Sequence, residues 1–385
     1  MDERPDVVLR CQARGFAFDV HGDAELRETL TALFAELERR TGSATALFSV
    51  GRPAGARSRW EVRVDGRLMM SCEQRGEALH GLVVFVNQRV MTANDDLLSL
   101  HAAAVATPKG AVLLPAEAGS GKTTLCARLL QDGAAYLSDD SVAITRQGRV
   151  LGYPKPLGFK VGTWEQFADA GLADLELDPG TQLVWQIPPS RLDAVSVAEA
   201  EPVAIVLPRF ESGAGLEVEA VSRPAAAAAL LGQVQNLPRF GVPAALEVIG
   251  RLAANVPAHA VVYGDAREAA PIVLELTARA ERGNGTYQVI EAEAPVEATT
   301  DVVPAGDVSA LCFEEGALLV RGESGEFLVV DRVGALIWPL FDGHRTAASI
   351  AQELAPLFGV SHATIEPDIS GWIAELVERA FLVRP

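Results

Sequence analysis

The pattern of apolar and polar positions along the chain changes several times, and each change predicts a different kind of element. Over residues 24–40 the apolar side chains recur at helical spacing, which predicts an amphipathic helix. Residues 60–64 alternate apolar and polar side chains as a strand does, and the following Asp65-Gly66 favours a hairpin. With strands expected over 7–10 and 16–20 and a helix over 77–92, this pattern predicts an N-terminal α/β domain over residues 1–95.

From residue 96 onward the pattern becomes an alternation of strands and helices. Two apolar segments, 97–106 and 111–114, predict strands joined by a turn, and a helix is expected to begin near Lys122. The further strands expected are 134–137, 204–207 and 259–263, and the further helices are 224–233, 243–254 and 266–281. The alternation predicts an α/β domain over residues 96–282, whose sheet need not be wholly parallel.

The pattern restarts near the C-terminus. Residues 283–304 are rich in Gly, Ala, Glu, Pro and Thr and are interpreted as a linker. Beyond them, short strands near 317–321 and 326–330 are followed by helices that include 348–357 and 365–382. Residues 305–385 are therefore predicted to form a separate C-terminal domain, and the whole chain is predicted to be a multidomain α/β (α+β) protein.

Composition narrows the functional classes. With 49% hydrophobic residues among 385, the chain can bury sizeable cores, which excludes a mainly disordered protein. Its formal net charge of −18 and its lack of a Lys/Arg run argue against binding to nucleic acid or to an anionic membrane. The cysteines have no metal-ligand spacing, and no apolar stretch is long enough to span a bilayer. We therefore expect a cytoplasmic protein whose oligomeric state is left open, a homo-oligomer included.

A phosphate-binding loop is the sharpest motif in the chain. Residues 116–123, Ala-Glu-Ala-Gly-Ser-Gly-Lys-Thr, follow the Walker A pattern except that Ala116 replaces the first glycine. Glycines let backbone N–H groups surround a phosphate, the lysine can reach the β- and γ-phosphates, and the threonine hydroxyl can hold Mg²⁺. Because an apolar strand precedes the loop and a helical run follows it, we interpret it as a nucleotide site rather than as a glycine turn with a helix cap. The residues expected to contact the nucleotide are Ala116, Glu117, Ala118, Gly119, Ser120, Gly121, Lys122, Thr123 and Thr124.

Three further polar residues lie near the ends of strands that flank this loop. His101 lies on the strand predicted before the loop, and Asp139 and Asp140 follow the strand predicted after it. A strand that ends beside a phosphate loop brings carboxylates to the metal and the γ-phosphate, where they can hold Mg²⁺ or accept a hydroxyl proton. Since adjacent strand residues point to opposite faces, one aspartate is expected to do the main chemistry. Taken alone, the histidine is also explained as a core or solvated residue, and the aspartates as a turn.

Taken together, Leu100-His101-Ala102-Ala103-Ala104-Val105, the loop, and Tyr136-Leu137-Ser138-Asp139-Asp140 resemble the HPr serine kinase/phosphorylase superfamily. The resemblance covers about residues 95–170 well and 200–280 loosely, and it implies a P-loop fold related to phosphoenolpyruvate carboxykinase. It also implies that Asp139 or Asp140 deprotonates an acceptor hydroxyl, with His101 as a supporting acid/base. By the same resemblance Lys122 and Thr123 hold phosphate and Mg²⁺, with Asp139 and Asp140 near the metal.

The segment after the aspartates departs from true HPr kinases. Their glycine-rich signature is missing, and residues 152–160, Gly-Tyr-Pro-Lys-Pro-Leu-Gly-Phe-Lys, resemble instead the kinase-related branch attached to peptide-modification systems. HPr is therefore not the expected substrate. Lys155 and Lys160 are candidate phosphate contacts at the substrate side, with solvated loop lysines as the alternative interpretation.

Residues 330–338, Val-Asp-Arg-Val-Gly-Ala-Leu-Ile-Trp, and 340–346, Leu-Phe-Asp-Gly-His-Arg-Thr, carry a second resemblance together with the helices that follow them. They resemble the PqqD-like family of peptide-recognition elements from ribosomal peptide modification. The resemblance implies a winged-helix-like domain of strands and three helices, in which a leader peptide adds a strand beside the third helix. The residues expected at that peptide site are Phe327, Leu328, Val329, Trp372, Leu376 and Arg379. A docking or dimerisation module is the alternative.

These observations lead to one expected function and two rivals. The expected function is an ATP- and Mg²⁺-dependent kinase that transfers the γ-phosphoryl group to a Ser/Thr hydroxyl of a ribosomally synthesised precursor peptide, whose leader the C-terminal domain binds. The first rival is a kinase of a small molecule, an amino acid or a sugar, with a regulatory C-terminal domain. The second is a non-catalytic, nucleotide-gated adaptor that delivers a peptide to another enzyme.

Overall fold

The computed structural model describes residues 7–39, 41–53, 59–160, 163–167, 184–291, 302–322 and 324–384. The chain divides into two compact units. Unit 1 comprises Met1–Ala220, Gln233–Asn236 and His259–Arg282, and unit 2 comprises Val221–Gly232, Leu237–Ala258 and Gly283–Pro385. Two segments that the sequence places in the central α/β domain thus belong to unit 2. The domain boundaries expected from the sequence stay predictions.

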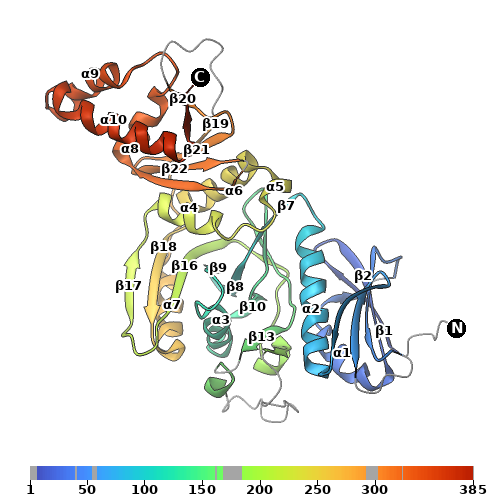
Figure 1. Cartoon of the computed structure of the whole chain (residues 1–385). Helices are drawn as coiled ribbons and strands as arrows, with labels where there is room; N and C mark the ends of the chain where they lie inside the picture. Colours follow the sequence, from blue (N-terminus) through green and yellow to red (C-terminus); the bar gives the residue numbers. More distant parts are fainter. Residues whose placement is uncertain are drawn as a thin grey trace. The chain divides into compact units, whose positions relative to one another are not determined.

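A six-stranded sheet forms the N-terminal part of unit 1 (Figure 1). Its strands lie in the order β3 (Glu38–Arg39), β1 (Val7–Ala13), β2 (Phe16–Gly22), β4 (Ala46–Gly51), β5 (Trp60–Val64) and β6 (Arg67–Cys72). Burial alternates along β2, β4 and β5, because one face of the sheet packs on helix α2 (Arg75–Thr92). The predicted strands, hairpin and long helix are therefore present.

The helix predicted over 24–40 is wrong in its second half. A 3-10 turn (Ala24–Leu26) leads into helix α1 (Arg27–Leu33), and β3 then pairs with β1. Leu37 lies beyond the helix but is buried in the same core as Leu30 and Leu33. The spacing of apolar residues indicates which side chains are buried, but it does not require a continuous helix. Here a short helix followed by a bend buries the same side chains.

A second six-stranded sheet lies at the centre of unit 1. Its strands lie in the order β10 (Ala135–Ser138), β8 (Ala102–Thr107), β9 (Gly110–Pro115), β16 (Pro202–Phe210), β18 (Ala258–Tyr263) and β17 (Glu217–Ala220). β9 pairs with β16 in parallel and with β8 antiparallel, so the sheet is mixed, a possibility that the sequence left open. Helices α3 (Lys122–Gln131) and α7 (Ala266–Arg279) pack against each other and against this sheet (Figure 1).

The single strand predicted over 97–106 is two strands that belong to different sheets. β7 (Leu97–Leu100) pairs with β11 (Val142–Thr145) in a sheet of order β15 (Glu199–Ala200), β12 (Val150–Leu151), β11 and β7. His101 lies between β7 and β8, and its backbone N–H donates to Gln233 O at 2.8 Å. A two-stranded ribbon, β13 (Leu157–Lys160) with β14 (Val184–Ile187), completes the described part of this region. The break in the strand places His101 at the head of β8.

Unit 2 is built on a four-stranded antiparallel sheet. Its strands lie in the order β19 (Gln288–Glu291), β21 (Val308–Phe313), β22 (Gly316–Arg321) and β23 (Phe327–Asp331). Helices α4 (Arg223–Leu231) and α6 (Val242–Asn255) contact these strands, and α5 (Leu237–Phe240) joins them. Helix α8 (Arg332–Ile337) contacts β22 and β23, and α9 (Ala347–Phe358) packs on α10 (His362–Glu378).

Two features of unit 2 differ from the sequence prediction. Strand β19 lies inside the segment interpreted as a linker, where it pairs with β21. Residues 292–301 of that segment lie outside the described residues. The last helix begins earlier than predicted and ends at Glu378, after which β24 (Leu382–Val383) pairs with β20 (Val303–Pro304). Phe381 and Leu382 are buried in the core of unit 2 at this strand. Their apolar side chains therefore do not indicate that the helix continues.

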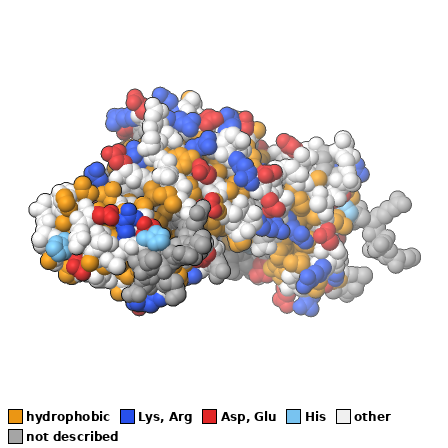
Figure 2. All heavy atoms as spheres, turned by 90° about the horizontal axis from the view of Figure 1, so that it is seen from above, with side chains coloured by type: hydrophobic (Ala, Val, Ile, Leu, Met, Phe, Trp, Pro, Cys, Tyr) orange, Lys and Arg blue, Asp and Glu red, His pale blue; other side chains and the backbone are white. Residues whose placement is uncertain are grey.

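Two surface observations bear on the partners of the chain. No helix among the described residues has the length and apolar character that a membrane crossing requires. On the face drawn in Figure 2, Lys and Arg side chains are interspersed with Asp and Glu side chains and with hydrophobic ones. That face therefore offers no continuous basic stripe for a phosphate backbone.

Candidate functional site

The loop between β9 and α3, where the sequence has its Walker A-like pattern, contains two glycines in the left-handed backbone region. Gly119 and Gly121 have φ values of +90° and +89°, a region that favours glycine. A Cβ atom at Gly121 would lie 2.3 Å from the hydroxyl oxygen of Tyr263, so no larger residue fits there without a shift. The loop thus curls directly onto the N-terminal end of the ten-residue helix α3, where backbone N–H groups can face an anion.

The ammonium group of Lys122 contacts three neighbours at this loop. Its Nζ donates to Ala116 O at 2.5 Å and to Glu117 O at 2.8 Å, and it lies 3.1 Å from His101 Nε2. The residue is only 5% exposed, and its burial lowers the pKa of the ammonium group. The lysine predicted to reach the phosphates is therefore already positioned at the loop by hydrogen bonds.

His101 connects Lys122 to Asp140. The Nδ1 atom of His101 lies 3.1 Å from Asp140 Oδ1. Because an ammonium group can only donate, Nε2 accepts from Lys122, and Nδ1 then carries the proton that is donated to Asp140. Burial lowers the pKa of His101, which keeps this neutral tautomer at pH 7, although Asp140 acts in the opposite direction. The Asp140 side chain is 43% exposed and lines a cavity beside the loop.

Asp139 has a different environment from its neighbour. Its Oδ1 accepts from Lys155 Nζ at 2.5 Å and from the Tyr136 hydroxyl at 3.1 Å. Its Oδ2 accepts from the backbone N–H of Gly158 at 3.1 Å and from the Thr123 hydroxyl at 3.3 Å. Both oxygens are thus engaged in hydrogen bonds, and the side chains of Asp139 and Lys155 are only 1% and 5% exposed. Lys155 and Lys160, both expected as phosphate contacts, line the cavity, but Lys155 is engaged in a buried ion pair with Asp139.

The cavity beside the loop has a volume of about 610 Å³ and is lined by more elements than the sequence indicated. It brings together the loop, His101, both aspartates, Lys160 and one face of α2 from the N-terminal sheet. From α2, His80 Nδ1 lies 2.9 Å from Gln186 Nε2, and Asn87 Oδ1 accepts from the Tyr153 hydroxyl at 2.8 Å. The periodicity of α2 predicts a helix, but no local signal shows that its polar residues line this cavity.

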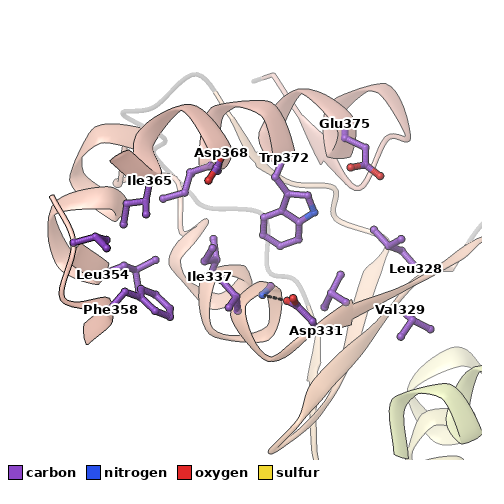
Figure 3. A pocket seen from close by; sticks show the side chains of 15 residues that line it. Leu328, Val329, Asp331, Ile337, Leu354, Phe358, Ile365, Asp368, Trp372 and Glu375 are labelled. Carbon is purple, nitrogen blue, oxygen red and sulfur yellow. Dashed lines mark hydrogen bonds between the residues drawn. The ribbon is translucent and has the colours of Figure 1, made fainter. Parts of the chain in front are cut away.

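Unit 2 contains a second concave site, a groove of about 700 Å³ between β23 and helices α8, α9 and α10 (Figure 3). The indole of Trp372 extends from α10 into the space that faces β23. Leu328 and Val329 lie along the strand, and Ile337, Leu354 and Phe358 come from α8 and α9. The lining is therefore mainly apolar, in contrast to the polar cavity of unit 1.

Strand β23 borders this groove and is the last strand of its sheet among the residues that the structure describes. Arg321 N donates to Glu326 O at 2.8 Å, and Gly322 N donates to Asp307 O at 2.8 Å. Because hydrogen-bonded pairs alternate in an antiparallel ladder, the backbone groups of Leu328 and Val330 point to β22, and those of Phe327, Val329 and Asp331 point outward. Outward N–H and C=O groups on an edge strand can pair with a further strand.

Three of the residues predicted for a peptide site do not present free side chains to this groove. Leu376 is fully buried in the core of unit 2. Arg379 lies 3.2 Å from Glu326 Oε1 in an ion pair and donates to Phe327 O at 3.4 Å. Phe327 itself is half-buried and is not among the residues that line the groove. Leu328, Val329 and Trp372 line the groove, and their contact with a peptide stays a prediction.

Comparison with known proteins identifies the domain that contains the groove. Residues 316–382 match the family model of coenzyme PQQ synthesis protein D (PqqD), which covers β22, β23 and helices α8 to α10. The C-terminal part of the chain is thus a PqqD-like domain, and the prediction of that domain is confirmed. No curated protein matches the chain. The resemblance of the loop region to HPr kinases stays a prediction.

Proposed function

We propose that the chain is an ATP- and Mg²⁺-dependent kinase that phosphorylates a Ser/Thr hydroxyl of a ribosomally synthesised precursor peptide, and that its PqqD-like domain binds the leader of that peptide. The observation that supports the kinase most directly is the chain of contacts from the loop through Lys122 and His101 to Asp140. These contacts bring an ammonium group, an imidazole and a partly exposed carboxylate together in one cavity, where the ammonium group could bind phosphate.

The loop supports the phosphate end of the reaction. Backbone N–H groups at the start of α3 would bind the β- and γ-phosphates, and Lys122 would exchange its contacts to Ala116 O and Glu117 O for phosphate oxygens. Positive groups fixed in this way stabilise the charge on the transferring phosphoryl group, since they need no reorganisation during the reaction.

Asp140 is the better candidate for the base. In the proposed transfer, the acceptor oxygen forms a bond to the γ-phosphorus, the bond from that phosphorus to the bridging oxygen of ADP breaks, and the hydroxyl proton passes to Asp140. His101 orients the carboxylate through the hydrogen bond at Oδ1. Asp139 is buried and has both oxygens engaged, so it is better suited to hold Thr123 and Lys155 in place.

The residues around Thr123 fit a magnesium ion. Hard oxygen donors suit Mg²⁺, and the Thr123 hydroxyl donates to Asp139, which leaves its lone pairs available to a cation. Among the described residues no group of three His, Cys, Asp or Glu side chains is arranged to hold a metal alone. Thr123 and an oxygen of Asp139 or Asp140 would therefore hold the ion together with phosphate oxygens. The bound ion would neutralise part of the phosphate charge.

The groove supports the peptide half of the proposal. An extended leader would pair with the outward backbone groups of Val329 and place alternate side chains against Trp372 and the apolar residues around it. Because the leader and the acceptor hydroxyl belong to one molecule, binding of the leader raises the effective concentration of the acceptor at the kinase site. Weak affinity for the acceptor residue itself would then suffice.

The test is to incubate the full chain with Mg²⁺-ATP and the short peptides encoded beside its gene, and to measure intact peptide mass. We expect a gain of one phosphoryl group that is lost in Lys122→Ala and kept in Lys109→Ala, since Lys109 is an exposed lysine in the turn between β8 and β9. Phosphorylation of free serine or a sugar without peptide would favour a small-molecule kinase. Binding of ATP and peptide without transfer would favour the adaptor.

A further inference from the structure

The groove of unit 2 combines apolar walls with carboxylates. Asp331, Asp368 and Glu375 line it alongside the apolar residues around Trp372 (Figure 3). None of the groove residues in the described part of the chain is Lys, Arg or His. A bound segment would therefore meet negative charge and no compensating positive charge on the lining.

The three carboxylates differ in how far they are already engaged. Asp331 caps α8, since its Oδ1 accepts from Gly334 N at 2.9 Å. Glu375 lies 3.8 Å from Arg379 in an exposed ion pair. Asp368 is exposed, and no hydrogen bond or ion pair to it occurs within the described ranges. Asp368 is thus the carboxylate most available to a charged group on a bound molecule.

The spacing along α10 sets where such a group would lie. Asp368 and Trp372 are four residues apart on α10, which is about 6 Å along a helix axis. Alternate residues of an extended strand are about 6.6 Å apart and point to the same side. A strand bound along α10 can therefore place one side chain at Trp372 and the side chain two positions away at Asp368.

We propose that the groove selects an extended peptide with an apolar residue at Trp372 and a Lys or Arg two positions away, opposite Asp368. This inference rests on the proposed peptide recognition and adds the chemical class of the segment that is recognised. Selectivity follows because an acidic residue at that position would face the like charge of Asp368.

The test compares three fluorescein-labelled peptides of nine residues on the full chain by fluorescence anisotropy. The first is Thr-Ser-Lys-Thr-Leu-Thr-Val-Thr-Ser, and the others replace its lysine by Gln or Glu. We expect the lysine peptide to bind about three- to fivefold more tightly than the Gln peptide, as one partly exposed ion pair allows. The Glu peptide should bind most weakly, and added salt should reduce the differences.

Two variants on the same helix separate a local contact from general charge. Asp368→Asn should abolish the preference for lysine. Glu366→Gln removes the same charge from a residue of α10 outside the groove lining, so it should leave the preference intact. Asp368 is exposed, and matching thermal unfolding curves would confirm that both variants fold.

The possible outcomes separate this inference from the proposed function. Equal binding of the three peptides would overturn the inference and leave peptide recognition standing. If Asp368→Asn and Glu366→Gln had the same effect, the preference for lysine would come from the overall charge of −18, and the inference would also be overturned. Binding of none of the peptides would count against peptide recognition at the groove itself, and the inference would fall with it.

Discussion

The cavity of unit 1 and the groove of unit 2 are both concave, yet they are built in opposite ways. In the cavity, polar and charged groups contact one another: the neutral His101 joins Lys122 to Asp140, and Lys155 and Asp139 form a buried ion pair. In the groove, the walls are apolar and the outward backbone groups of Val329 face away from the sheet.

This difference indicates two kinds of recognition. A network of mutually positioned charges suits a single reaction geometry, because displacement of one group disturbs the others. An apolar groove beside a strand edge obtains affinity from backbone pairing and apolar area, so it accepts different sequences that share a pattern. Substitutions in the first site should therefore have larger effects than substitutions in the second.

The largest effect is expected for Asp140→Asn. If Asp140 is the base, the rate of phosphoryl transfer should fall by about 10²- to 10⁴-fold, because the amide cannot accept the hydroxyl proton. Nucleotide binding and unfolding should change little, since this side chain is partly exposed. Single-turnover kinetics and nucleotide titration measure the two quantities. An unchanged transfer rate would remove Asp140 from the mechanism.

The next effect concerns stability. Lys155→Met leaves Asp139 as a buried charge without its cation, which should lower the free energy of unfolding by about 3–5 kcal/mol. Urea unfolding of the isolated variant measures this loss. The double variant Lys155→Met/Asp139→Asn should regain part of it, because the unpaired charge is then gone. A single variant as stable as the original chain would mean that the pair is not buried as described.

A substitution in the groove should act on binding and leave nucleotide chemistry unchanged. Val329→Pro removes an outward N–H donor without removing a bond to β22, so peptide affinity should fall by about tenfold. Val329→Thr keeps that donor and is the matched control. Isothermal titration with the precursor peptide measures both. Equal affinities for the two variants would argue against addition of a strand at this edge.

Much of the local structure could be predicted from the sequence, because the signals are themselves local. The strand, loop and helix around Gly119, Gly121 and Lys122 follow from residues within one short segment. The roles of Asp139 and Lys155 could not be predicted in this way. They depend on burial produced by strands that are distant in sequence, and that burial turns an expected phosphate contact into one half of an ion pair.

The groove shows the same limit. Leu328, Val329 and Trp372 were expected at a peptide site because of the resemblance to the PqqD-like family, and all three line the groove. Leu376 follows Trp372 by one helical turn and is buried in the core. Helical spacing places both residues on one face, but only the packing of α10 decides which of them the core covers and which lines the groove.

A smaller effect on the free energy of unfolding is expected when the pH is lowered. Burial lowers the pKa of His21, His80, His101 and His259 below the ordinary value of 6.5. The unfolded chain therefore binds more protons than the folded chain below pH 6.5, and stability should fall as the pH falls from that value. Urea midpoints between pH 7.5 and about 5.5 measure the slope. His80→Gln should make it shallower, and an unchanged slope would contradict the assignment for His80.

The smallest effect is expected for Arg379→Ala. Its ion pairs with Glu326 and Glu375 are at the surface, so their loss should change the free energy of unfolding by less than about 1 kcal/mol. Thermal unfolding measures this change. The control is Glu378→Gln, which alters an exposed residue at the end of α10. A larger loss would show that Arg379 supports the fold.

Arg379 has a further consequence for any strand that is added to β23. Its guanidinium already occupies the carbonyl of Phe327, the first outward acceptor of the strand. A peptide strand that extends as far as Phe327 would have to displace the arginine, whereas one that pairs only from Val329 onward would not. If a peptide does bind at this edge, Arg379 would thus limit the register of the added strand, and we expect its own contribution to the stability of the domain to be small.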